Sequence, residues 1–140
     1  MNKLRQLIQF AGIIAVCSAP MFAQNSVNLA AKVPFAFIVG TRSMPAGDYI
    51  FYVQSGSPVL TVRTTNGASG AMILTTNATR FNPTKQSKLV FRVYGEESYL
   101  AGVWTAGIAS GRETPKTGAE KESERAGIPM NVAVLALGVQ

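Results

Sequence analysis

The sequence predicts an all-β fold: a single small antiparallel β-sandwich or partly open barrel of about seven strands, with one short helix near the C-terminus. Three observations favour this class. From Val27 onward the chain is rich in Val, Ile, Thr, Phe and Tyr, the residues that are enriched in strands. Gly, Pro, Asn or Ser interrupts it about every 8 to 12 residues, the spacing of short strands joined by turns. Apolar and polar side chains alternate between several of these breaks, as they do in half-buried strands.

Residues 33–39 and 48–54 are each predicted as a strand, with a turn over residues 40–47 between them. The turn contains Pro45, whose fixed φ suits the second position of a turn, and Gly47, which can adopt a left-handed conformation. Alternation places Val33, Phe35, Phe37 and Val39 on one face of the first strand, and Tyr49, Phe51 and Val53 on one face of the second. The other face of the first strand, with Pro34, Ala36 and Ile38, is apolar too, so we expect that strand to be covered on both sides.

Residues 59–65 and 71–76 are predicted as the next pair of strands. Leu60 and Val62 face inward in the first of them. Asn66-Gly67 lies between the two strands and predicts a type I′ hairpin turn, because both residues tolerate positive φ. Residues 77–88 are polar and contain a proline, so we expect them to form the longest loop of the sheet region.

A second hairpin is predicted from residues 89–94 and 98–108, turning at Gly95-Glu96-Glu97. The inward face of its first strand carries Leu89, Phe91 and Val93. Trp104 lies in the second strand, and we expect it to anchor the core. Its expected contacts are aromatic: Phe35, Phe37, Phe91 or Tyr49.

Residues 110–126 are strongly charged and nearly free of large apolar side chains. A short helix is predicted over Ala119–Ala126. We expect the segment to be exposed, to tolerate substitution with little loss of stability, and to govern contact with a partner. Residues 131–139 are again strand-like, and we expect them to close the sheet by pairing with an early strand.

Residues 1–23 show the three-part layout of a secretory signal peptide. They open with two positive charges and no acid, continue with an apolar run from Leu7 to Val16, and end in small residues up to Ala23. The run is shorter than the roughly 20 residues of a transmembrane helix. We therefore expect export to the periplasm or the extracellular space, and a mature chain of residues 24–140 that forms one domain without a transmembrane span.

The composition narrows the chemistry of the mature chain. The sequence has no histidine, and its only cysteine, Cys17, lies in the predicted signal peptide. Histidine catalysis and thiolate chemistry are thereby excluded, and we expect no metal site and no cofactor. Without the two basic residues of the signal, the chain has 11 basic and seven acidic residues, which gives a net charge of +4. These charges are scattered along the chain, so nucleic-acid binding is not expected.

The carboxylates are the remaining candidates for catalysis. They are Asp48, Glu96, Glu97, Glu113, Glu120, Glu122 and Glu124. All lie at predicted turns or among lysines and arginines, where solvation is the ordinary role of a carboxylate. We therefore expect no catalytic residues and no enzyme. The alternative is a carboxylate-dependent glycan hydrolase, which needs two of these acids within about 10 Å of each other across one pocket.

Three short motifs occur in order: Val33-Pro34-Phe35-Ala36-Phe37, Met44-Pro45-Ala46-Gly47-Asp48-Tyr49, and Leu89-Val90-Phe91-Arg92 followed by Tyr99-Leu100-Ala101 and Trp104. In them the chain resembles a group of small exported bacterial β-proteins of unknown function, which share the motifs VPFxF and LPAGxY and a late FxxYG hairpin. The resemblance covers most of residues 32–126. Met44 stands where leucine is usual, and Ala36 where an acid is common. The resemblance implies kinship without an activity, and no functional residue is carried over.

These observations predict a non-catalytic envelope or secreted β-domain that acts by binding. The expected partner is another envelope protein or a surface polymer. A third hypothesis is a purely structural subunit whose exposed edge strand pairs with a partner.

Overall fold

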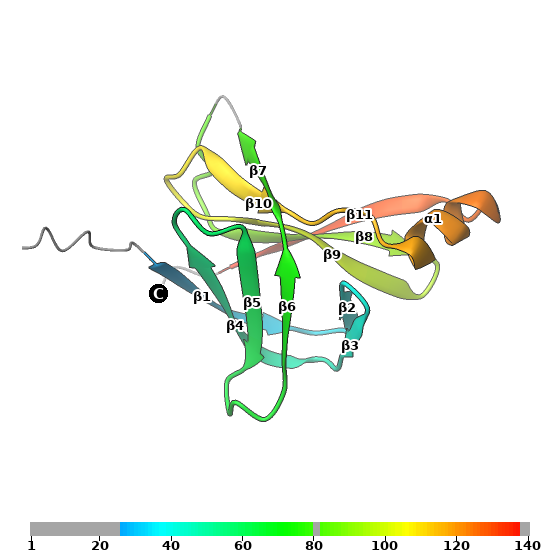
Figure 1. The fold of residues 1–140 in the computed structure, drawn as a ribbon, viewed down its shortest axis with the longest axis horizontal. Coiled ribbons are helices and arrows are strands. Elements are labelled where there is room, and N and C mark those ends of the chain that lie inside the picture. The colour runs from blue at the N-terminus through cyan, green and yellow to red at the C-terminus, as the bar shows by residue number, and fades with distance from the viewer. Residues whose placement is uncertain (1–25, 80–81, 138–140) are drawn as a thin grey trace, which may run out of the picture.

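The computed structural model of the protein describes residues 26–79 and 82–137, and over these residues two sheets form the fold (Figure 1). Sheet A has the strand order β1 (Ser26–Val33), β4 (Gly47–Gln54), β5 (Val59–Thr64), β6 (Gly70–Leu74). Sheet B has the order β11 (Met130–Ala136), β8 (Lys88–Tyr94), β9 (Glu97–Trp104), β10 (Ser110–Glu113), β7 (Thr76–Thr79), with β2 (Phe37–Val39) and β3 (Arg42–Met44) attached beside β9. One helix, α1 (Gly118–Arg125), connects β10 to β11. The predicted all-β class with a short helix near the C-terminus is confirmed.

The core is built from alternate residues of the two sheets. Phe37 is at its centre, because its ring meets Tyr49 edge to face at 5.0 Å and Phe91 at 5.7 Å. Phe35 is only partly buried but packs its ring against Phe91 at 5.0 Å. The apolar faces predicted from alternation pack in this core, but the second face of residues 33–39 is not covered as expected, because Pro34 and Ala36 are exposed. The buried cluster comprises Leu29, Ala31, Val33, Phe37, Val39, Met44, Tyr49, Phe51, Leu60, Val62, Leu89, Phe91, Leu100, Val103 and Leu137.

The predicted strand over residues 33–39 is divided in two by Pro34. β1 ends at Val33, and β2 begins only at Phe37. Proline has no N–H to donate to a ladder, so it is a natural end for a strand. β1 pairs along its whole length with β4 of sheet A, whereas β2 pairs with β3 and meets β9 of sheet B at Ile38–Tyr99. The segment after Val33 therefore carries the chain from one sheet to the other.

The turn before β4 is fastened by a tyrosine. The Tyr49 hydroxyl donates a hydrogen bond to the Pro45 carbonyl, four residues back, while the ring is buried in the core. Burial raises the pKa of Tyr49 above its ordinary value. A Cβ added at Gly47 would lie 3.8 Å from the Tyr49 ring. The sequence pattern from Met44 to Tyr49 therefore has a structural role, because it packs and fastens the turn before β4.

The connection between β5 and β6 differs from the predicted two-residue turn. Gly67 has a φ of 74°, as expected, but its N–H bonds to the Thr64 carbonyl at 2.8 Å. The central residues of that turn are therefore Thr65 and Asn66. The Thr64 N–H in turn reaches the Ser69 carbonyl at 2.9 Å, which closes a four-residue loop. Asn66 stabilises the loop through its Oδ1, which accepts the N–H of Ala68 at 3.0 Å.

Three further expectations about strands are wrong. β7 and β10 form within segments predicted as polar loops, because they pair with each other and β10 also pairs with β9. The strand predicted over residues 98–108 ends at Trp104. β11 pairs with β8 over seven residues, from Met130–Tyr94 to Ala136–Lys88, and not with an early strand. The predicted strand end at residues 138 and 139 lies outside the described residues.

Trp104 is buried, with 3% of its surface exposed, but not where the sequence predicts. Its neighbour Val103 belongs to the core cluster, so Trp104 points to the opposite face of sheet B. There it lies over Gly111 of β10, its cross-strand partner: a Cβ added at Gly111 would lie 2.5 Å from the Trp104 Cε3. Trp104 therefore lies outside the core cluster that contains Phe37, Phe91 and Tyr49, and its ring covers a glycine of β10.

Residues 1–23, where the signal peptide is predicted, lie outside the described part of the chain. Among the described residues, no helix has the length and apolar character needed to cross a membrane.

Candidate functional site

The charged segment before β11 is fixed to the outer face of sheet B by a buried ion pair. Glu120 is completely buried, and its Oε1 accepts the Nε of Arg92 at 2.6 Å. Arg92 also donates to the carbonyl oxygens of Thr114 and Pro115, at 3.2 and 3.3 Å. One guanidinium thereby ties β8 to both α1 and the segment that leads into it.

Glu120 also closes the N-terminus of α1. Its Oε2 accepts the N–H of Thr117 at 2.7 Å, and the Thr117 hydroxyl accepts the N–H of Glu120 at 3.1 Å. This reciprocal arrangement is a capping box, which satisfies two N–H groups at the start of the helix. The expectation that this whole segment is exposed is therefore wrong at Thr114 and Glu120. The Thr-x-x-Glu spacing is a sequence signal for the start of the helix, but not for the burial of its glutamate.

Two tyrosines continue this polar cluster along sheet B. The Tyr94 hydroxyl donates to Glu124 at 2.9 Å, and the Tyr99 hydroxyl donates to Glu97 at 2.8 Å. Their rings meet edge to face at 5.8 Å. Burial, followed by the hydrogen bond to a carboxylate, raises the pKa of each tyrosine to about 12. The hydrogen bond from Lys116, followed by that from Tyr94, lowers the pKa of Glu124. These side chains are paired with one another, which is an arrangement that holds a helix in place.

The most exposed apolar surface of sheet B lies beside this cluster, on β11. Met130, Val132 and Val134 are 40%, 60% and 58% exposed and share one face of the strand. The alternate residues Ala133 and Leu135 pack against the core. β11 is the last strand of its sheet, and within the described residues no strand pairs with its outer edge. Its outward-pointing N–H and C=O groups are therefore open to another chain.

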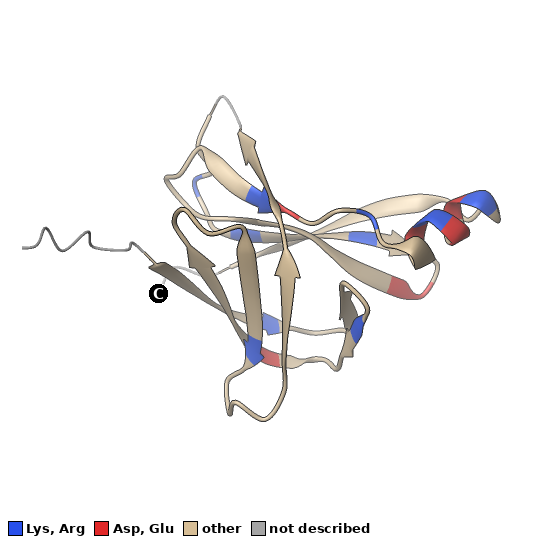
Figure 2. Cartoon of the chain, in the orientation of Figure 1, with Lys and Arg blue, Asp and Glu red and all other residues tan. Residues whose placement is uncertain are grey.

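β11 has none of the features by which proteins normally protect a sheet edge. Lysines, prolines, bulges and inward-pointing charges are the usual means. Figure 2 shows β11 without a charged residue, whereas the charges gather on α1 just before it. The strand is regular over its seven pairs with β8. β11 is therefore the best candidate for an interaction site in this part of the chain.

β6 is the comparable edge of sheet A. Met72 and Leu74 are 71% and 65% exposed, and the strand is also uncharged. β6 is shorter, however, at five residues, and after Thr75 the chain passes directly into β7 of the other sheet. β6 therefore offers a partner a shorter length of free backbone than β11.

Three of the seven carboxylates considered for catalysis, Glu97, Glu120 and Glu124, belong to the polar cluster around Tyr94 and Tyr99. Asp48 lines one pocket among the described residues, together with Ala30 and Thr65, whereas two other pockets there have no carboxylate in their walls. Glu120 is engaged by Arg92, and Glu124 by Lys116 at 2.5 Å. Glu97 holds Tyr99 beside the β8–β9 turn. The exposed remainder are Glu96, Glu113 and Glu122.

The fold is an all-β sandwich in which the Arg92–Glu120 ion pair holds α1 against sheet B and β11 is an unprotected edge strand. Comparison of the chain with protein families, with curated proteins and with solved structures finds no match.

Proposed function

We propose that this chain is an exported, non-catalytic binding domain of the cell envelope, which pairs β11 with an extended segment of a partner protein. The observation that carries the proposal is the free edge of β11 combined with its exposed apolar face. Strand addition of this kind takes affinity from main-chain hydrogen bonds and specificity from alternate side chains. Seven uncharged residues, Met130–Ala136, are available for it.

The outer face of sheet B indicates the chemistry of the partner. Val134 lies opposite Val90 in the ladder, and Val132 lies opposite Arg92, whose charge is already neutralised by Glu120. A strand added beside β11 would continue this face, so apolar side chains at alternate positions would be buried against Val132 and Val134. We therefore expect the partner segment to be extended, uncharged over about seven residues and apolar at every second position.

The proposal is tested by site-specific photocrosslinking in the native host. A photoreactive residue at Val134 is compared with one at Met72, which is also apolar and exposed but lies on the edge of the other sheet. The expected result is a discrete protein adduct at position 134 that is absent at position 72. Equal adducts at both positions, or none at 134, would contradict the proposal. A glycan adduct at 134 would instead favour a surface polymer as the partner.

A charge at the edge provides the complementary variant. Val132→Lys places an ammonium beside the free edge, where a pairing strand would have to bury it, and we expect it to abolish the adduct at position 134. Because Val132 is 60% exposed, we expect the substitution to leave the fold intact, and circular dichroism checks this, since the new lysine stands opposite Arg92 in the ladder. Met72→Lys is the matched control and should leave the adduct unchanged. Loss of the adduct in both variants would point to a general effect of charge and not to pairing at β11.

Glu97, Glu120 and Glu124 are engaged by Tyr99, Arg92 and Lys116, so no specific observation favours the glycan hydrolase as a second candidate.

A further inference from the structure

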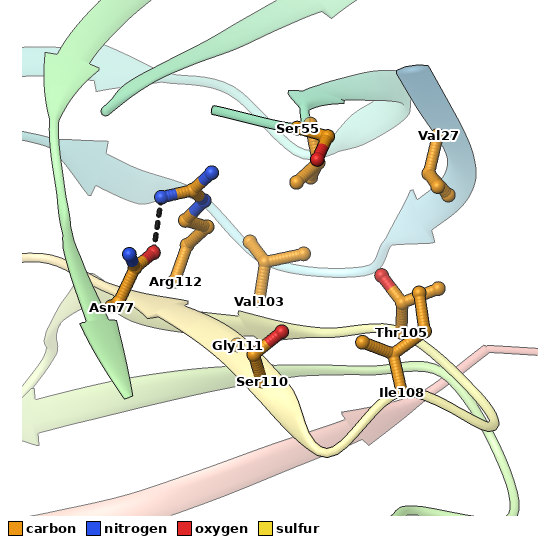
Figure 3. Close-up of a pocket in the computed structure, with 10 residues that line it drawn as sticks. Val27, Ser55, Asn77, Val103, Thr105, Ile108, Ser110, Gly111 and Arg112 are labelled. Carbon is orange, nitrogen blue, oxygen red and sulfur yellow. Dashed lines mark hydrogen bonds between the residues drawn. The ribbon is translucent and has the colours of Figure 1, made fainter. Parts of the chain in front are cut away.

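A pocket of about 220 Å³ lies between the two sheets, and no residue of β11 is in its lining (Figure 3). Its walls are aliphatic on both sides: Val27 and Val53 come from sheet A, and Val103 and Ile108 from sheet B or the loop after it. The volume is below the roughly 300 to 1,000 Å³ of pockets that hold drug-sized ligands, so an occupant would be small. Ser55 and Ile108 are exposed at its rim, so the pocket is open to solvent.

One cation, Arg112, lines the same pocket. It is half-buried on β10, directly opposite Asn77 of β7 in the ladder, and Figure 3 shows the two side chains joined by a hydrogen bond. The Arg112 Nη1 donates to Asn77 Oδ1, and its Nη2 donates to the Gln54 carbonyl at 3.0 Å. Both acceptors are neutral. The two ion pairs between described residues, Arg92–Glu120 and Lys116–Glu124, do not involve Arg112.

No carboxylate of the described part of the chain pairs with this half-buried guanidinium, which is unusual, because burial of a charge is costly unless an opposite charge compensates it. The planar N–H groups of the guanidinium match the two oxygens of a carboxylate. The aliphatic walls match a short hydrocarbon body, which gains free energy when its apolar surface leaves water. A single cation also matches a single negative charge better than a dianion such as phosphate.

We propose that this inter-sheet pocket binds a small aliphatic monocarboxylate, with the carboxylate on Arg112 and the hydrocarbon chain between Val53 and Val103. The site is separate from β11, so this ligand would bind independently of the partner proposed above. Asn77 holds the guanidinium in place and sets how strongly it attracts the ligand, because its neutral amide leaves the charge of Arg112 uncompensated.

The test uses hexanoate as the probe in a calorimetric or NMR titration of the purified protein. Hexan-1-ol has the same hydrocarbon body without the charge, and inorganic phosphate has charge without the body. We expect saturable hexanoate binding that is about tenfold tighter than binding of hexan-1-ol, from the strength of charge-assisted hydrogen bonds. Absence of saturable hexanoate binding, equal affinity for the alcohol, or equal affinity for phosphate would each overturn the proposal.

Asn77→Asp is the decisive variant, because it changes the charge beside Arg112 and hardly changes the shape. The new carboxylate would pair with the guanidinium, and hexanoate affinity should fall by about tenfold while hexan-1-ol affinity stays the same. Arg112→Gln should have the same effect, but it also removes the contact with Gln54, so its folding must be checked separately. Arg63→Gln, an exposed arginine of β5, is the control and should leave affinity unchanged. Hexanoate affinity at the wild-type level in Asn77→Asp would overturn the role assigned to Arg112.

Discussion

Replacing Glu120 with alanine would remove the carboxylate that joins α1 to sheet B. The change leaves Arg92, whose side chain is only 14% exposed, without its counter-ion. Loss of one partner of a buried ion pair costs about 3 to 5 kcal/mol. Arg92 keeps the Thr114 and Pro115 carbonyl oxygens as acceptors, so the lower part of that range applies. The broken capping box adds a smaller amount, and we expect Glu120→Ala to lower the free energy of unfolding by about 4 kcal/mol.

Glu120→Gln separates the charge of the side chain from its shape. Glutamine can retain the hydrogen bond from the Thr117 N–H, because it also serves in capping boxes. It leaves the positive charge of Arg92 uncompensated, and we expect a loss of about 2 kcal/mol, half that of the alanine variant. Glu122→Ala is the control, since Glu122 is exposed on the same helix and should change stability by less than about 0.5 kcal/mol.

The assay is urea unfolding followed by circular dichroism, with the midpoint and slope compared between the three variants and the wild type. We expect Glu120→Ala to be the most destabilised, followed by Glu120→Gln, with Glu122→Ala close to the wild type. A Glu120→Ala midpoint close to that of the control would refute this expected order. That outcome would mean that α1 is held by other contacts, or that the segment is the solvated linker expected from its composition.

Two further predictions concern the outer face of sheet B. Gly111→Ala should destabilise the protein by about 2 kcal/mol and shift Trp104 fluorescence to longer wavelengths, because the new methyl group would displace the indole. Gly118→Ala is the control: its added methyl group meets open space, so we expect neither a loss of stability nor a shift in fluorescence. Raised pKa values mean that Tyr94 and Tyr99 hold their protons more tightly when folded. The contribution of these two tyrosines to the free energy of unfolding should therefore be fully present below pH 10 and be lost as the pH rises toward about 12. Urea titrations at several pH values check this, and a free energy of unfolding that is constant over this range would contradict the prediction.

Alternation of apolar residues was sufficient to predict the inward faces of the sheets. Phe37, Phe51 and Phe91 lie where a period of two places them, because one face of each strand is buried against the other sheet. The same alternation also indicates β1, where it involves Val27, Leu29, Ala31 and Val33, although the predicted strand began only at residue 33.

The features that were missed depend on distant residues. β10 has almost no apolar side chain and forms only because β9 and β7 lie on either side of it. Glu120 is buried because Arg92, 28 residues earlier, lies across from it. Trp104 turns away from the core because Gly111 leaves room for its ring on the other face. Local sequence contains no direct signal for such pairings, so the candidate site on β11 also emerged only from the topology.

Hydrogen–deuterium exchange of the β11 amides tests the proposed pairing most directly. It is measured on the protein alone and in complex with the partner crosslinked at Val134. Pairing predicts that amides within Met130–Ala136 exchange more slowly in the complex, because outward N–H groups gain acceptors, while those of β6 (Gly70–Leu74) keep their rates. Unchanged exchange in β11, with protection at another surface of the complex, would contradict the assignment of this edge as the binding site.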